Sequence, residues 1–340
     1  MTTSKAFYQL ERLEIRDLSG NPEISNSILY ENNFKSLITG LDLTKLTSLE
    51  SEAIEDFVNL EILKLPDDMD EGDFEGTVFK NFPKLKELWV GENFEVDSDS
   101  LKPLVNLEIL HSGDSLISDL SFLPKLRVLF LEESLSTNVN INALTQLEEL
   151  HLDASGVIDE AYKNLVNLRV LEIDTNYITG RYFSNLINLQ ELIILSGNIQ
   201  DEMNATTSLK KLILPQTPPV TTTNKGIQTL VNLEYLSLGE AKSITDSGLA
   251  KLTNLIYLDV GYNRKITDKA ILKLKKLEYL DVGSANITSA SWSKLPNLKY
   301  LKIGFVAKGD VEILQKMDLK ALYVVNGDTR SFGNIDLWKF

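Results

Sequence analysis

The chain has 340 residues, 43% of them hydrophobic, which is the composition of a globular protein. No apolar run approaches the roughly 18 residues that a membrane span needs, and the first residues lack the apolar stretch of a signal peptide. The net charge of −15 argues against binding to nucleic acid or anionic membranes, and the absence of cysteine excludes disulfide-bonded end caps.

A six-residue pattern, L-x-x-L-x-L with Ile or Val allowed at the apolar places, recurs along the whole chain. Its fifteen copies begin at Leu10, Ile38, Leu60, Leu85, Leu107, Leu126, Leu147, Leu168, Leu189, Leu209, Leu233, Leu255, Leu277, Leu298 and Leu319. Successive copies start 19 to 28 residues apart. A unit of this length that recurs so often predicts a solenoid.

Each copy predicts one short strand. The second and third apolar places are two residues apart, which is the spacing of side chains on one face of a strand. In the copy that begins at Leu255, we expect Leu258 and Val260 to point inward and Tyr257 and Asp259 to point outward. Strands stacked in this way form a parallel sheet on the concave face of a curved solenoid.

The rest of each repeat returns the chain to the next strand. In residues 244–252 and 266–274 a Thr and an Asp precede an apolar pattern, which predicts a short helix or a single helical turn on the convex side. The longer early repeats are expected to carry fuller helices, for example at residues 51–58. We predict one elongated domain at residues 1–325 and a C-terminal apolar cap at residues 326–340, made by Phe332, Ile335, Leu337, Trp338 and Phe340.

These units closely resemble the leucine-rich repeat family, and residues 168–178 and 255–263 match its repeat through the Asn. The period of 21–22 residues in many copies is similar to the short type found in internalin-like bacterial proteins and in the regulatory subunit of protein phosphatase 1. The resemblance covers residues 7–325. It implies an α/β horseshoe of about 15 repeats, with a parallel β-sheet on the concave face, that binds proteins. The Asn of the repeat is kept only at Asn93, Asn176 and Asn263, so we expect an incomplete asparagine ladder.

Three patterns hint at chemistry, and none is complete. Residues 113–116 read G-D-S-L, as in a large esterase family, but the chain has no Asp-x-x-His to activate the serine. His111 and His151 lie two strands apart with Phe130 between them, which is too far for one zinc ion. The acidic residues 67–75 do not match a calcium-binding loop. We therefore predict no enzyme activity, no metal and no cofactor.

One outward row of the expected sheet holds Trp89, His111, Phe130 and His151. The next row begins with two glycines, which are expected to leave room beside the rings, and continues with an acidic ridge of Glu132, Asp153 and Asp174 near Glu172. Exposed rings rimmed with acid suit a binding hot spot for a basic partner. The alternative is that the rings merely pack on one another across the strands.

A second aromatic row holds Tyr235, Tyr257, Tyr279 and Tyr300 in four consecutive repeats. Tyrosine is a frequent recognition residue, although recent duplication of one repeat would also produce this row. Between the two rows, an apolar strip of Ile193, Leu195, Ile213 and Pro215 also suits a partner.

The charge is unevenly spread. Residues 1–200 hold 35 acidic and 15 basic residues, whereas residues 201–340 hold 14 and 19. The acidic part either keeps the solenoid soluble or attracts a basic partner. We predict a cytoplasmic, monomeric binding protein of the immunity or inhibitor type that neutralises or regulates a basic protein partner. The alternatives are an adaptor or regulatory subunit that recruits an enzyme to its target, and a secreted bacterial adhesin.

Overall fold

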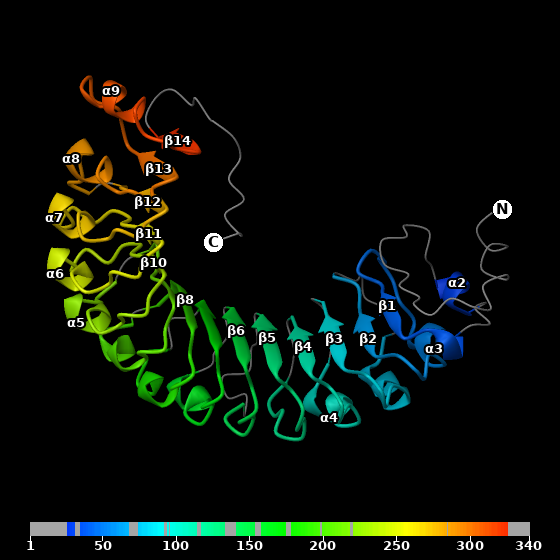
Figure 1. The fold of residues 1–340 in the computed structure, drawn as a ribbon. Helices are drawn as coiled ribbons and strands as arrows, with labels where there is room; N and C mark the ends of the chain where they lie inside the picture. Colours follow the sequence, from blue (N-terminus) through cyan, green and yellow to red (C-terminus); the bar gives the residue numbers. More distant parts are fainter. Residues whose placement is uncertain are drawn as a thin grey trace, which may run out of the picture. The chain divides into compact units, whose positions relative to one another are not determined.

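A computed structural model describes residues 26–30, 35–67, 74–91, 94, 96–113, 117–132, 141–153, 158–174, 178–197, 199–217, 220–283 and 285–325 (Figure 1). The chain divides into two compact units, residues 1–168 and 169–340. The described residues include fourteen of the fifteen predicted strands. The repeat that begins at Leu10 and the predicted cap at residues 326–340 lie outside them.

In the first unit, parallel strands pair in chain order, each with the strand of the next repeat. They are β1 (Gly40–Asp42), β2 (Ile62–Lys64), β3 (Glu87–Val90), β4 (Ile109–Ser112), β5 (Val128–Glu132) and β6 (Glu149–Asp153). The helical segments of this unit are α2 (Asn26–Tyr30), η1 (Lys35–Leu37), α3 (Ser51–Ile54), η2 (Gly76–Asn81), α4 (Ser98–Leu101) and η3 (Asp159–Tyr162).

The second unit follows the same plan. Its parallel strands are β7 (Val170–Asp174), β8 (Glu191–Ser196), β9 (Lys211–Ile213), β10 (Tyr235–Ser237), β11 (Tyr257–Asp259), β12 (Tyr279–Asp281), β13 (Tyr300–Ile303) and β14 (Ala321–Val324). Its helical segments are η4 (Phe183–Asn185), η5 (Glu202–Ala205), α5 (Asn224–Ile227), α6 (Asp246–Leu249), α7 (Asp268–Ile271), α8 (Ser289–Trp292) and α9 (Asp310–Leu314). The predicted repeat of one strand and one helical turn is confirmed for most of the described repeats, but the described residues between β4 and β5 and between β5 and β6 contain no helix.

The expectation of fuller helices in the early repeats is wrong. The segment at residues 51–58 contains only α3, which ends at Ile54. The backbone N–H of Phe57 then donates to the carbonyl of Ile54, which is the tighter bond of a turn, and Phe57 is fully buried. Anchoring Phe57 in the core thus directs the chain back toward β2 after a single helical turn.

The core consists of the repeating leucines, which lie between the strands and the helical segments. Leu88, Leu110, Leu129 and Leu150 pair from strand to strand, and each is fully buried. Burying a leucine contributes about 1.5–3 kcal/mol, so each repeat is stabilised mainly through its neighbours. We call the other side of the strands, away from the short helices, the open sheet face (Figure 1).

Threonine and aspartate link successive helical turns in the second unit. The N–H and the hydroxyl of Thr267 both donate to the carboxylate of Asp246, at 2.8 and 2.7 Å, and Thr288 makes the same pair of bonds to Asp268. The hydroxyls of Thr267 and Thr288 also cap their own helices. The helix starts predicted from I-T-D therefore also form a ladder between repeats, which the sequence analysis did not anticipate.

A similar ladder, which sequence reasoning also missed, lies just before several of the strands. The amide of Asn106 donates to the carbonyl of Pro83 in the preceding repeat, and the ammonium of Lys125 in the next repeat donates to the Asn106 side chain. The same bond to the preceding repeat is made by Asn59, Asn167, Asn232, Asn254 and Asn297. The sequence signal for this ladder was an Asn directly before the first Leu of these copies of the repeat. Of the three residues at the expected asparagine place, Asn263 alone lies within the described residues, where it is fully buried.

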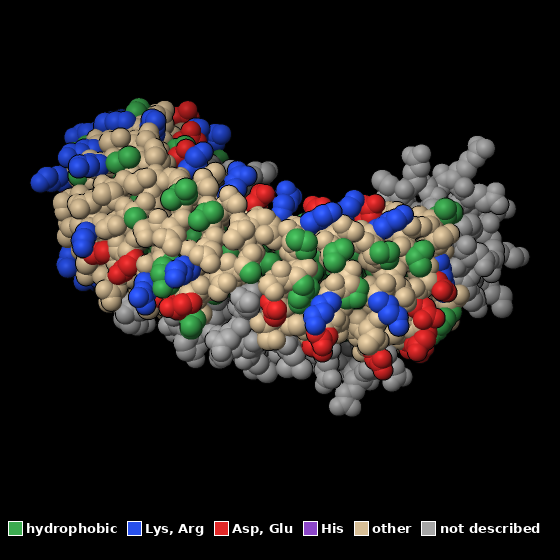
Figure 2. Space-filling view, turned by 90° about the horizontal axis from the view of Figure 1, so that it is seen from below, with side chains coloured by type: hydrophobic (Ala, Val, Ile, Leu, Met, Phe, Trp, Pro, Cys, Tyr) green, Lys and Arg blue, Asp and Glu red, His purple; other side chains and the backbone are tan. Residues whose placement is uncertain are grey.

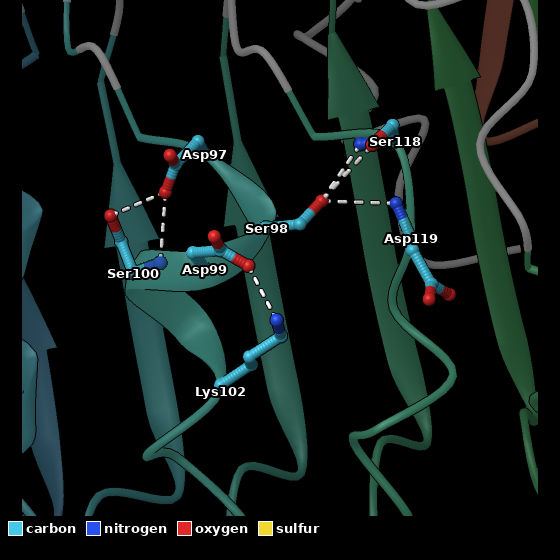
Figure 3. Close-up of polar contacts among 7 residues, drawn as sticks. All are labelled: Asp97, Ser98, Asp99, Ser100, Lys102, Ser118 and Asp119. Carbon is cyan, nitrogen blue, oxygen red and sulfur yellow. Dashed lines mark hydrogen bonds and ion pairs between the residues drawn. The ribbon is translucent and has the colours of Figure 1, made fainter.

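The first unit links its turns with different residues, around α4 (Figure 3). Asp97 caps α4 by accepting from the N–H and the hydroxyl of Ser100, and these bonds lower the pKa of the Asp97 carboxyl. The hydroxyl of Ser98 accepts from the N–H groups of Ser118 and Asp119 in the next repeat, at 2.9 and 3.0 Å. A single serine thus joins two neighbouring turns.

Candidate functional site

Four aromatic rings form a stacked column on the open sheet face of the first unit. Trp89, His111, Phe130 and His151 stand at paired positions of β3 to β6. Neighbouring ring centroids are 3.5, 3.8 and 3.9 Å apart, and the ring planes are within 13° of parallel. The structure therefore brings together the row predicted from the sequence. We call these four residues the ring column.

The Trp89 end of the column is covered by a charged pair. The ammonium of Lys64 lies 4.4 Å from the centroid of the Trp89 ring and 3.9 Å from the Glu87 carboxylate. Glu87 also accepts a hydrogen bond of 2.7 Å from the indole N–H of Trp89. Trp89 is half-buried, so the expectation of an exposed tryptophan is wrong. The column offers a partner ring edges rather than ring faces.

Burial keeps the middle of the column uncharged. The pKa of His111 falls from 6.5 to about 4 because the stacked ring loses contact with water, and the nearby His151 and Lys64 oppose a further positive charge. At neutral pH the His111 ring is therefore neutral. The neutral His111 ring stacks between the rings of Trp89 and Phe130.

We expect acid to destabilise this chain partly through His111. The unfolded chain, with an ordinary histidine pKa of 6.5, binds more protons than the folded chain between pH 6.5 and about 4, so the free energy of unfolding should fall across that range. NMR titration should give His111 a pKa near 4, and the variant His111→Gln should show a smaller loss of stability from pH 7 to pH 4. A His111 pKa near 6.5 would contradict the buried, neutral ring.

Two further rows flank the ring column. Ile109 and Val128 lie half-buried on the same face, two residues before His111 and Phe130, and extend its apolar surface. Sequence reasoning missed them because, in these repeats, it followed only the rows with aromatic or charged residues. On the other side, a Cβ on Gly91 would lie 2.0 Å from the carbonyl oxygen of Pro66. Close backbone packing therefore explains the glycine, rather than room for the rings.

The acidic rim is partly assembled. Glu132 and Asp153 are exposed and stand directly opposite each other on β5 and β6. Two acidic side chains therefore stand side by side at this edge of the ring column. Glu172 and Asp174 belong to β7 in the second unit, where both are half-buried. Of the predicted ridge, the structure therefore shows only Glu132 and Asp153 side by side within one unit.

The tyrosine row of the second unit is also a stack, which we call the tyrosine column. The ring centroids of Tyr235 and Tyr257 are 3.9 Å apart, those of Tyr257 and Tyr279 are 4.2 Å apart, and Tyr300 pairs with Tyr279 in the sheet. Tyr257 and Tyr279 are only 8% and 4% exposed, and burial raises the pKa of both phenols. Most of this column is therefore internal packing, and a partner would reach only its rim.

Beside the tyrosine column runs a row of polar side chains. Ser237 donates to Asp259 at 2.9 Å, and Lys302 forms an ion pair of 2.7 Å with Asp281. Burial, and the charge of Asp281 in the next strand, raise the pKa of the Asp259 carboxyl. In the next row Gly261 has a φ of +57°, and a Cβ there would lie 2.1 Å from the carbonyl oxygen of Gly239. Glycine is therefore required where these turns pack backbone to backbone.

The apolar strip predicted between the two columns is only partly accessible. Leu195 is 45% exposed and Ile193 and Ile213 are half-buried, but Pro215 is buried. Among the described residues, no group of three or more His, Cys, Asp and Glu side chains could hold a metal ion. Residues 114–116 of the G-D-S-L sequence and residues 68–73 of the acidic stretch lie outside the described part of the chain.

Comparison with known proteins supports the fold. A family model described as a leucine-rich repeat matches residues 251–275. A leucine-rich repeat protein of Leptospira interrogans is 25% identical, with a TM-score of 0.65 over 87% of this chain and 81% of that chain. An internalin of Listeria monocytogenes, InlF, is 21% identical, with a TM-score of 0.56 over 84% of this chain and 90% of that one.

A third similar structure is that of a complex. The ectodomain of the plant receptor kinase GASSHO1/SCHENGEN3 from Arabidopsis thaliana, in complex with Casparian strip integrity factor 2, is 17% identical. Its TM-score is 0.52, over 92% of this chain and 44% of that chain. No curated protein matches the sequence. In the described part of the chain, every helix is too short or too polar to cross a membrane.

Proposed function

The chain is a leucine-rich repeat protein, and we propose that it binds a basic protein partner through the open sheet face, with the ring column at the centre of the contact. The observation that carries this proposal is the stacking of Trp89, His111, Phe130 and His151 at 3.5 to 3.9 Å. A surface whose side chains are already ordered loses little entropy on binding. Rigid aromatic groups of this kind are frequent centres of protein interfaces.

The rest of the site supports a protein rather than a small molecule as the ligand. Ile109 and Val128 widen the apolar centre, and the charged side chains of Glu132 and Asp153 stand at its edge. An apolar centre with a charged rim is the usual anatomy of a protein interface. The plant receptor ectodomain with the same fold, solved in complex with Casparian strip integrity factor 2, supports the general mode of use.

A basic partner is favoured by charge. The first 200 residues carry 35 acidic and 15 basic side chains, a field that speeds the encounter with a cationic protein. Within this proposal, the protein acts as a non-enzymatic, cytoplasmic monomer that neutralises or regulates its partner, as an immunity or inhibitor protein does.

We expect the association rate constant to fall as salt rises from low concentration to about 0.5 M, because salt screens attraction between charged surfaces. Replacing Glu132 and Asp153 with lysine should slow association at low salt. Reversing Glu52 of α3 and Glu55, the C-cap of that helix, is the matched control and should slow association less, although both residues are exposed in the same unit. Stopped-flow or surface-based kinetics would measure the rates.

The partner for these measurements would be isolated by affinity capture on the native chain. Capture on the chain with Trp89 and Phe130 replaced by alanine would run in parallel. A partner captured equally by both chains, or an association rate independent of salt, would count against the proposal.

A further inference from the structure

A hollow of about 420 Å³ lies in the second unit, where the chain leaves β10 and β11. Glu240 and Lys242 line it from the turn after β10, and Tyr262, Arg264 and Lys265 line it from the turn after β11. None of these residues belongs to the ring column or the tyrosine column. The hollow is therefore separate from the surface proposed above to bind a protein.

The hollow is positively charged. Lys242 lies 2.5 Å from the Glu240 carboxylate, whose side chain is only 12% exposed, so these two charges compensate each other. Arg264 and Lys265 are exposed, and neither forms an ion pair with any other described residue. Two positive charges thus remain for a ligand. Lys and Arg side chains are also frequent on the later repeats of this unit, at the left of Figure 2.

The backbone that presents these side chains is fixed. The amide of the fully buried Asn263 donates to the carbonyls of Ala241 and Ile244, at 2.9 and 2.7 Å, and its oxygen accepts from the N–H of Lys265 at 2.8 Å. The carbonyl of Arg264 accepts from the Asn286 amide in the next repeat. The turn is thereby held on both sides, so binding does not require the backbone to become ordered.

We propose that this hollow binds a small phosphate monoester, such as a sugar phosphate. A phosphate monoester carries a charge of about −1.5 to −2 at pH 7, which matches the two uncompensated cations. The Arg264 guanidinium suits paired hydrogen bonds to phosphate oxygens, and the Lys265 ammonium adds a mobile positive charge.

The organic part of the ligand has a place in the same hollow. Tyr262 is 57% exposed at its wall and offers a flat ring for a sugar or another compact group. A volume of about 420 Å³ falls within the range of small-molecule sites and is larger than a lone phosphate requires. A long nucleic acid is disfavoured, because the chain as a whole carries a net charge of −15.

Calorimetric titration of the full chain tests this proposal. Glucose 6-phosphate is the probe, and we expect saturable binding with one site per chain, at least fivefold tighter than for inorganic phosphate, and no binding of glucose. The double variant Arg264→Gln and Lys265→Gln should bind the ester at least tenfold more weakly. Both side chains are exposed, and an unchanged circular dichroism spectrum would show that the variant is folded.

The control variant carries Lys251→Gln and Lys269→Gln, which remove two positive charges from exposed positions outside the hollow. It should bind the ester within twofold of the native chain. Equal weakening in the control, or native affinity in the Arg264 and Lys265 variant, would overturn the site. Inorganic phosphate binding as tightly as the ester would overturn the ester as ligand. A phosphoserine peptide binding while glucose 6-phosphate does not would replace it with a phosphoprotein.

Discussion

Replacing Trp89 and Phe130 together with alanine is expected to weaken partner binding by more than about 2 kcal/mol, which is about 30-fold in Kd. The two substitutions remove alternate rings of the column, so His111 loses the rings on both of its faces and His151 loses the Phe130 ring. They also remove the hydrogen bond that the indole N–H of Trp89 donates to Glu87, and they remove the ring that lies beneath the Lys64 ammonium. The partner would then meet a disordered surface that is more polar.

The fold should survive this change, because the inward neighbours Leu88, Val90, Leu129 and Leu131 keep their places in the core. Phe305→Ala is the matched control, since Phe305 is 70% exposed and belongs to the second unit, outside the ring column. Titration calorimetry on the three chains measures the affinities. A loss of less than threefold in the double variant, with its melting temperature unchanged, would show that the ring column is packing and not a binding centre.

A chain that ends at Asn326 is expected to aggregate or to unfold from its C-terminal end. In the last repeat Leu319, Leu322 and Val324 are half-exposed, whereas the equivalent Leu298, Leu301 and Ile303 of the preceding repeat are at most 5% exposed. We propose that residues 327–340, with their five large apolar side chains, cover this open end. At about 25 cal/mol per Å², uncovering a few such side chains costs several kcal/mol.

Hydrogen exchange on the shortened chain is the direct test, because a solenoid loses its stability repeat by repeat from an uncovered end. We expect β13 and β14 to exchange faster than in the full chain, while β3 and β4 keep their protection. Replacing Phe332 and Trp338 with serine in the full-length chain should give a smaller change in the same direction. Full protection of β13 and β14 in both variants would mean that the tail is not a cap.

Much of the fold follows from one pattern, for a physical reason. In L-x-x-L-x-L each apolar place has a single environment, so Leu88 and Leu110 occupy equivalent buried positions on neighbouring strands and the register is fixed. The same alternation places Trp89 and His111 on the opposite face, which is why the stack could be predicted from the sequence alone. The length of the helices was less predictable. Phe57 is anchored in the core three residues after α3 ends, and this packing, rather than local helix propensity, returns the chain to the next strand.

The neighbours of the ring column could not be predicted in the same way. That Trp89 is half-buried depends on the position of the Lys64 ammonium and on the Glu87 carboxylate, which are long side chains with several rotamers. The ladder formed by Asn106 and its equivalents depends on a bond to the carbonyl of another repeat, which the repeat pattern alone does not reveal. The hollow beside Tyr262 arises from two turns whose side chains differ in charge and size, although the strands before them are near-copies.

The central claim, that the open sheet face of the first unit binds a protein, is tested most directly by hydrogen exchange on the chain with and without its captured partner. We predict that binding slows exchange in β3 to β6, the strands that carry the ring column, and leaves α3 and α4 unchanged. The chain with Trp89→Ala and Phe130→Ala should show no such change at the same concentrations. Slower exchange confined to α3, α4 and the neighbouring turns, with β3 to β6 unaffected, would contradict the claim and place the partner on the opposite side of the sheet.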